Sequence, residues 1–162
     1  MIDPEFDRLV SEALEHQFSG WDFSWLKDRW ISGEIPWDYR AEVVTRLPGV
    51  KRLLDMGTGG GEFLASLPGL PKFVTATEGY IPNVGVAGRR LHPLGISVVG
   101  VEGDEDRLPF AGGSFDLVIN RHESFEGGEL ARILVPGGMF LSQQVGGCDN
   151  SELNRVLAPE RL

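Results

Sequence analysis

The stretch Leu53-Leu54-Asp55-Met56-Gly57-Thr58-Gly59-Gly60-Gly61-Glu62-Phe63 determines how the rest of the chain is interpreted. An apolar run leads directly into a turn with four glycines in five positions, and a helical pattern with Phe63, Leu64 and Leu67 on one face follows. Glycine allows positive φ and a close approach of the backbone to a ligand. The stretch therefore predicts a strand, a binding turn and a helix, with the ligand at the carboxyl end of the strand.

The residue ahead of the turn indicates the kind of ligand. Dinucleotide-binding turns read G-x-G-x-x-G and hold a pyrophosphate, whereas Gly57, Gly59 and Gly61 follow a G-x-G-x-G spacing behind Asp55. A carboxylate disfavours a pyrophosphate and suits an ammonium group, such as the one that S-adenosylmethionine carries beside its sulfonium. An ordinary glycine-rich strand-to-helix turn remains the alternative.

Beyond Pro48-Gly49, short apolar runs alternate with helical stretches. The predicted strands cover residues 50–56, 73–77, 96–101, 115–120 and 139–145, and the predicted helices between them cover 60–67, 82–91 and 124–134. This alternation indicates an α/β domain with a parallel sheet and right-handed crossovers. One more helix is expected at 151–157.

Residues 1–47 form a separate, helical part of the predicted architecture, ahead of a core over residues 48–162. Helices are expected from Pro4 onward, at 24–31 and at 37–47, and the segment contains all four tryptophans. It could act as a lid over the cofactor, or its aromatic residues could simply pack on the sheet. Trp37 and Tyr39, just ahead of the first strand, are candidate cofactor contacts.

Acidic residues also follow the second and third predicted strands. Glu78 lies about 20 residues beyond the glycine turn, where nucleoside-binding α/β folds place a carboxylate on the ribose hydroxyls. Asp104 could accept a hydrogen bond from an adenine amino group, and the backbone N–H of Glu105 could donate to a ring nitrogen. Solvated acids at strand ends are the alternative in each case.

Four segments of the chain resemble, in order and spacing, the motifs of class I S-adenosylmethionine-dependent methyltransferases. They are residues 55–61 (motif I), Glu78 (the acid after strand two), residues 103–118 (G-D-x-x-x-L-P-F…S-F-D) and residues 134–140 (L-x-P-G-G). The resemblance is closest to the type 11 subgroup, which is similar to quinone-biosynthesis C-methyltransferases. It implies a Rossmann-like doubly wound sheet of five parallel strands in the order 3-2-1-4-5 with flanking helices.

The resemblance also implies S-adenosylmethionine as the cofactor and a set of residues that bind it. The expected contacts are Asp55, Gly57 and Gly59 for the methionine portion, Glu78 for the ribose, Asp104 and Glu105 for the adenine, Asn120 near the sulfonium, and Thr58, Gly61 and Gly79 beside them. Tyr80 stands near the position where many members pack an apolar residue on the adenine, and it could supply that surface.

Methyl transfer from a sulfonium is an in-line displacement that positioning alone can accelerate. The candidate catalytic residues, His122 and Arg121, follow the fourth predicted strand. His122 could act as a base for an acceptor that loses a proton, and Arg121 could hold an acidic group of the acceptor. A plain helix-start cluster, with Glu123 favoured by the helix dipole, is the alternative.

Composition narrows the classes of partner. A net charge of −9 disfavours binding to nucleic acid, and no N-P-P-Y-type signature lies near Asn120. Cys148 is the only cysteine, so neither an internal disulfide nor a metal cluster is expected. No apolar run reaches the ~20 residues of a membrane span, and Met1-Ile2-Asp3-Pro4-Glu5 does not resemble a signal peptide. These features predict a soluble cytoplasmic protein without a membrane partner.

The leading prediction is therefore an enzyme that methylates a small-molecule acceptor. Family members usually continue with strands six and seven, so we expect a truncated or degenerate chain whose fifth strand has an open edge. Open edges invite pairing, which makes a homodimer through this strand, or a non-catalytic cofactor-binding or self-assembling module, the alternative function. A nucleotide-dependent oxidoreductase is disfavoured by the spacing of the glycine turn.

Overall fold

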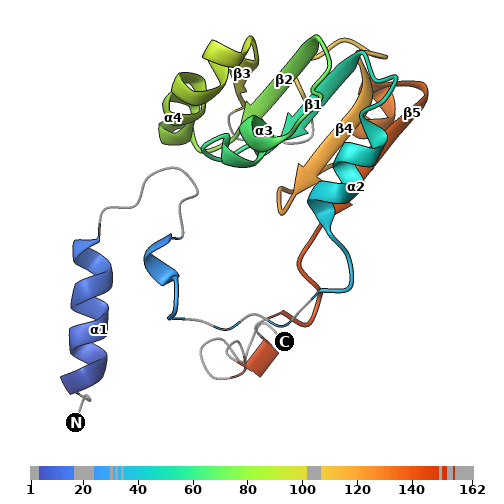
Figure 1. The fold of residues 1–162 in the computed structure, drawn as a ribbon. Helices are drawn as coiled ribbons and strands as arrows, with labels where there is room; N and C mark the ends of the chain where they lie inside the picture. The colour runs from blue at the N-terminus through green and yellow to red at the C-terminus, as the bar shows by residue number, and fades with distance from the viewer. Residues whose placement is uncertain are drawn as a thin grey trace.

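The core of the molecule is a five-stranded parallel sheet in the order β3-β2-β1-β4-β5 (Figure 1). The computed structural model describes residues 4–16, 24–29, 31, 33, 35–101, 107–149, 151, 152 and 155. The strands are β1 (Arg52–Met56), β2 (Phe73–Glu78), β3 (Ser97–Gly100), β4 (Phe115–Arg121) and β5 (Leu134–Gln143). The predicted fold class and strand order are confirmed.

Alternating side chains along the strands build an apolar layer on each face of the sheet. The helices are α1 (Pro4–Glu15), α2 (Tyr39–Arg46), α3 (Glu62–Ser66), α4 (Ile81–Leu91) and α5 (Gly127–Ile133), with the 3-10 turns η1 (Ser24–Leu26) and η2 (His92–Leu94). Leu53 and Ile119 pack in one cluster with residues of α2, α3 and α4. Leu54 and Val118, one position away, pack in the other cluster with residues of α5.

Element boundaries differ from the sequence prediction where turn chemistry interrupts the periodic pattern. The helix predicted over 24–31 is a 3-10 turn of three residues. The fifth strand begins at Leu134 rather than at 139, because β5 bulges: Phe115 pairs with Leu134, but Leu117 pairs with Met139. Gly137, at φ +78°, lies within this bulge. The helix predicted over 151–157 and the tryptophans Trp21 and Trp30 fall largely or wholly outside the described residues.

Helix α1 lies apart from the sheet and contacts the η1 region instead (Figure 1). Arg29 forms an ion pair with Glu12 at 3.4 Å, and the His16 ring stacks on Trp25 with 5.1 Å between centroids. None of the helices in the described part of the chain combines the length and the apolar character that a membrane crossing requires.

Helix α2 is tied to β4 through a buried tyrosine hydroxyl. Asp38 caps the helix by accepting a hydrogen bond from the Ala41 N–H at 3.2 Å. The Tyr39 hydroxyl donates to the carbonyl oxygen of Asn120 at 2.9 Å and accepts from the N–H of the same residue at 3.1 Å. Burial is the main reason that the pKa of Tyr39 is raised. This contact fixes α2 against the strand that carries Arg121.

Removal of this hydroxyl should weaken the fold. We expect Tyr39→Phe to lower the free energy of unfolding by about 1–2 kcal/mol, because a buried donor and acceptor lose their partner. Urea denaturation followed by circular dichroism measures the change. Tyr80→Phe is the matched control, because Tyr80 is 65% exposed and should unfold like the wild type. Equal midpoints for the two variants would contradict this account.

Candidate cofactor-binding site

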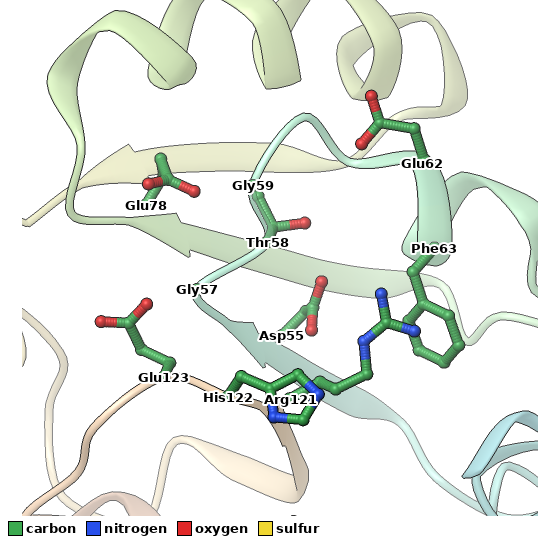
Figure 2. A pocket seen from close by; sticks show the side chains of 10 residues that line it. All are labelled: Asp55, Gly57, Thr58, Gly59, Glu62, Phe63, Glu78, Arg121, His122 and Glu123. Atoms are coloured by element: carbon green, nitrogen blue, oxygen red, sulfur yellow. The ribbon is translucent and has the colours of Figure 1, made fainter. Parts of the chain in front are cut away.

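A cleft opens where the carboxyl ends of β1, β2 and β4 meet (Figure 2). The residues lining it are Asp55, Gly57, Thr58, Gly59, Glu62, Phe63, Glu78, Arg121, His122 and Glu123. They come from three strand ends, from the turn after β1 and from the start of α3, which is the position that open α/β sheets give to their ligands. Asp55 and Glu78 therefore share one cleft, as the sequence predicts.

The glycine turn places its backbone against the cleft wall. Gly57, Gly59 and Gly61 all have positive φ, at +66°, +61° and +80°. The turn is anchored to β2 because the Thr58 N–H donates to the Thr77 carbonyl oxygen at 2.9 Å. A Cβ on Gly57 would lie 2.6 Å from the Cβ of Glu123, closer than real side chains approach. The turn therefore requires glycine at position 57 for both backbone and steric reasons.

Asp55 is a buried carboxylate at the floor of the cleft, only 5% exposed. Burial raises its pKa to about 7, and the negative charge of Glu78 contributes in the same direction. The Thr58 side chain and the positive charge of Arg121 partly oppose this shift. A carboxylate held away from water with incomplete charge compensation is well suited to a cationic ligand.

This raised pKa predicts opposite pH dependences for ligand binding and for stability. A cation bound by ionised Asp55 should dissociate more readily as pH falls, with affinity about tenfold lower at pH 6 than at pH 8. Stability without ligand should instead fall as pH rises from about 4 to about 7, because the folded state retains a proton that the unfolded chain releases near 3.8. Calorimetric titrations with S-adenosylhomocysteine and urea denaturation between pH 5 and 8 test both signs.

Glu78 presents a second carboxylate from the end of β2. It is 6% exposed, and its Oε1 accepts a hydrogen bond from the Tyr80 N–H at 2.8 Å, which fixes the side chain across the turn into α4. A carboxylate oriented in this way can accept two charge-assisted hydrogen bonds from a diol. The geometry is therefore compatible with the ribose contact that the sequence predicts.

The end of β4 supplies the basic side of the cleft. The Arg121 guanidinium lies over the Phe63 ring, with 4.9 Å between its carbon and the ring centroid (Figure 2). His122 has a φ of +69°, and its backbone N–H donates to the Gln143 carbonyl oxygen at 2.9 Å. Burial and the charge of Arg121 lower the pKa of His122. The imidazole is therefore mostly neutral at pH 7, the form that can accept a proton.

Some predicted contacts lie away from this cleft. Asn120 is fully buried; its Oδ1 accepts from the Gln144 Nε2 at 2.8 Å, while its Nδ2 has no partner in the described structure. Gly61 and Gly79 do not line the cleft either. Asp104 and Glu105 lie outside the described residues. Trp37 and Tyr39 line a neighbouring hollow instead.

Three residues of the cleft were not among those predicted as cofactor contacts or catalytic residues, namely Glu62, Phe63 and Glu123. Glu62 forms an ion pair with Arg90 at 2.5 Å. The first two directly follow the glycine turn and the third directly follows His122, so their proximity to the motifs was the available signal. No group of three or more His, Cys, Asp or Glu residues in the described part of the chain is arranged to hold a metal ion.

The methyltransferase domain family, type 11, matches residues 54–142, which is more than half of the chain. This chain belongs to that family. The match begins within β1 and ends within β5, so it includes the described residues of the cleft.

Solved structures show the same methyltransferase fold. YcgJ of Bacillus subtilis is 22% identical with a TM-score of 0.59, over 75% of this chain and 59% of that one. A protein of Methanococcus maripaludis, assigned as an S-adenosyl-L-methionine-dependent methyltransferase, is 19% identical with a TM-score of 0.55, over 75% and 63%. The chain thus spans about 60% of the length of these structures.

A third similar structure contains bound S-adenosylhomocysteine. Phosphoethanolamine N-methyltransferase 1 of Haemonchus contortus, in complex with phosphoethanolamine and S-adenosylhomocysteine, is 22% identical with a TM-score of 0.54. The alignment covers 67% of this chain and 26% of that one. No curated protein sequence matches this chain significantly.

Family and fold identify S-adenosylmethionine as the cofactor, and the cleft of this methyltransferase domain fits it. Asp55 and Glu78 supply negative charge on the side of the glycine turn, which matches a ligand with an ammonium and a sulfonium. Gly57 and Gly59 line the cleft with their backbone and carry no side chain into it. The buried side chain of Thr58, which lowers the pKa of Asp55, adds a polar group to the same part of the cleft.

Proposed function

We propose that this methyltransferase domain transfers the methyl group of S-adenosylmethionine to a small molecule. The observation that carries the proposal is Asp55, a buried carboxylate with a pKa of about 7 beneath a turn that only glycine can form. A site of this kind favours a cation at its floor. The net charge of −9 supports a small molecule rather than a nucleic acid as the acceptor.

The bound cofactor would supply an electrophilic methyl group attached to a sulfonium. The chain's own residues then bind, orient and exclude water. Asp55 would hold the ammonium group, and Glu78 would hold the ribose hydroxyls. Asp104 and Glu105 are our proposed adenine contacts.

The wall formed by Phe63 and Arg121 would separate the reacting groups from solvent. Neutral His122, which lines the same cleft, could accept a proton from an acceptor hydroxyl or amine. Most of the rate would come from positioning, because the sulfonium is already a good leaving group.

Binding of S-adenosylhomocysteine tests the proposed cofactor directly. We expect isothermal titration calorimetry at pH 8 to give one site per chain with a dissociation constant in the micromolar range. No detectable heat up to millimolar ligand, from a protein whose circular dichroism shows a folded state, would overturn the proposal.

A second proposal concerns self-association through β5. In the described residues β5 pairs with β4 on one side only, so the ten-residue strand has an unpaired outer edge. Met139, on this strand, is also exposed. Unpaired edges of this length attract a further strand, which supports either a homodimer or a non-catalytic assembly module.

Light scattering coupled to size-exclusion chromatography tests this second proposal. We expect the mean mass to rise above 17.8 kDa toward that of a dimer as the concentration is raised from about 10 µM to about 1 mM. Replacement of Met139 by Lys should suppress the rise, since lysine is a common protection of strand edges. A constant monomer mass over the whole range would exclude the homodimer.

A further inference from the structure

A second hollow adjoins the cofactor cleft and shares a wall with it. Phe63 and Arg121 line both spaces, and the stacked pair they form lies between them. The second hollow is otherwise lined by the segment leading into α2, by the first turn of α2 and by the end of β5, including Ile35, Trp37, Arg40 and Gln143. A ligand in this hollow would thus lie beside whatever occupies the cofactor cleft.

The lining of the hollow is net positive, because Arg40 and Arg121 face a single acid, Asp38, although the charge of Arg121 also acts on Asp55 in the cofactor cleft. Arg121 has no carboxylate within 4.0 Å in the described structure, and its guanidinium contacts the Phe63 ring instead. Arg40 donates to the hydroxyl and the carbonyl oxygen of Ser66, both at 2.7 Å, and these partners are uncharged. The one acid in the lining, Asp38, already accepts the helix-capping hydrogen bond from Ala41.

Among the other described arginines some form ion pairs, and others, such as Arg52 and Arg89, form none. Arg46, Arg90 and Arg132 each form an ion pair with a glutamate. In a protein with net charge −9, arginines have many acids available as partners. Two arginines against one acid in the lining therefore favour an anion in this hollow.

Aromatic and aliphatic side chains make up most of the remaining lining. The indole N–H of Trp37 donates to the Gln143 Oε1 at 3.0 Å, which fixes the ring while half of its surface stays exposed. Ile35, on the same segment, is also exposed. The amide of Gln143 in turn lies 3.4 Å from the His122 ring, so Trp37 is connected to the end of β4. An exposed, oriented indole offers a stacking surface to a planar ring.

We propose that this second hollow is the acceptor subsite and that it takes a small aromatic acid, with the carboxylate on Arg121 and the ring on Trp37. The proposal rests on the proposed methyltransferase function, because it places the acceptor next to the donor. Arg40, which lines the same hollow, would add attraction for the anion. The shared Phe63–Arg121 wall would then contact both cofactor and acceptor.

Three small probes distinguish the contribution of the planar ring from that of the negative charge. Benzoate carries both the ring and the charge, benzamide keeps the ring without the charge, and cyclohexanecarboxylate keeps the charge without a planar ring. Ligand-observed NMR titrations, with and without S-adenosylhomocysteine, would measure the three affinities. We expect benzoate to bind about tenfold more tightly than either of the other probes.

Two variants test whether the preference for benzoate over the other two probes arises in this hollow. Arg121→Gln should remove the preference for benzoate over benzamide, and Trp37→Leu should remove the preference for benzoate over cyclohexanecarboxylate while leaving the affinity for S-adenosylhomocysteine unchanged. Arg46→Gln is the matched control, because Arg46 lies on α2 in an ion pair with Glu42 and away from both spaces. It should behave like the wild type.

The outcomes distinguish this inference from the proposed function. Equal affinities for the three probes, or an unchanged preference in both hollow variants, would overturn the aromatic-acid subsite even if S-adenosylhomocysteine binds. Failure of S-adenosylhomocysteine to bind would instead overturn the proposed function, and with it the assignment of this hollow as an acceptor subsite.

Discussion

The Asp55→Asn variant should bind S-adenosylhomocysteine about 100-fold more weakly than the wild type at pH 8, without becoming less stable. The ionised carboxylate is the buried partner of the ligand's ammonium group in the proposed complex. Loss of one partner in a buried, hydrogen-bonded charge pair costs about 3 kcal/mol, which corresponds to a factor of about 100.

The stability of the same variant should move in the opposite direction. At pH 8 the wild type holds a buried negative charge on Asp55, because burial raises the pKa of that carboxyl only to about 7. The asparagine amide has nearly the same shape without that charge, so Asp55→Asn should unfold at the same or a higher urea concentration. If the variant binds S-adenosylhomocysteine more weakly but unfolds at a higher urea concentration, its binding defect is not caused by misfolding.

Two comparisons complete this experiment. Asp7→Asn, on the exposed surface of α1, makes the same chemical change away from the cleft and should leave the affinity unaltered. The pH dependence of binding between pH 6 and 8 should disappear in Asp55→Asn, because the titrating group is gone. Wild-type affinity in Asp55→Asn would show that the cleft does not use this carboxylate for the ligand.

The sequence predicts the framework of the site well because its signals are local. A buried strand, a glycine turn and a helix follow one another without interruption around Asp55, and an acid follows the second strand at Glu78. The carboxyl ends of neighbouring parallel strands lie at one edge of the sheet, so sequence order alone brings these two acids together.

Other features of the site depend on the directions of individual side chains, which a periodic sequence pattern does not specify. Asn120 directly precedes Arg121 on β4, but successive side chains on a strand point to opposite faces. Arg121 reaches the cleft, while Asn120 is buried under Gln144. The hydroxyl of Tyr39 meets the backbone of Asn120 across 81 residues of chain, which no local pattern indicates.

The start of the fifth strand also depends on tertiary structure. The sequence Pro136-Gly137-Gly138 is a strong turn signal, so a strand is predicted only after it. In the structure this turn becomes a bulge within β5, because Phe115 and Leu117 on β4 hold the two sides of it in register. Tertiary pairing determines the strand boundary here, against the local preference.

The Gly57→Ala variant should lower the free energy of unfolding by about 2–5 kcal/mol and abolish measurable binding of S-adenosylhomocysteine. An alanine at φ +66° costs about 1–2 kcal/mol of backbone strain. Its Cβ would also lie 2.6 Å from the Cβ of Glu123 and 2.8 Å from the Cγ, so Glu123 or the turn has to move, which costs about 1–3 kcal/mol more.

The chain contains a control that separates the two contributions. Gly69 has nearly the same φ, +69°, but nothing lies within 4 Å of an added Cβ, so Gly69→Ala should show the strain alone and bind ligand normally. Replacing Glu123 by Gly in the Gly57→Ala background removes the clashing atoms and should recover the steric part of the stability but not the strain. If Gly57→Ala and Gly69→Ala lose equal stability and both retain binding, the close packing between the glycine turn and Glu123 has no role in the site, because only Gly57 makes that contact.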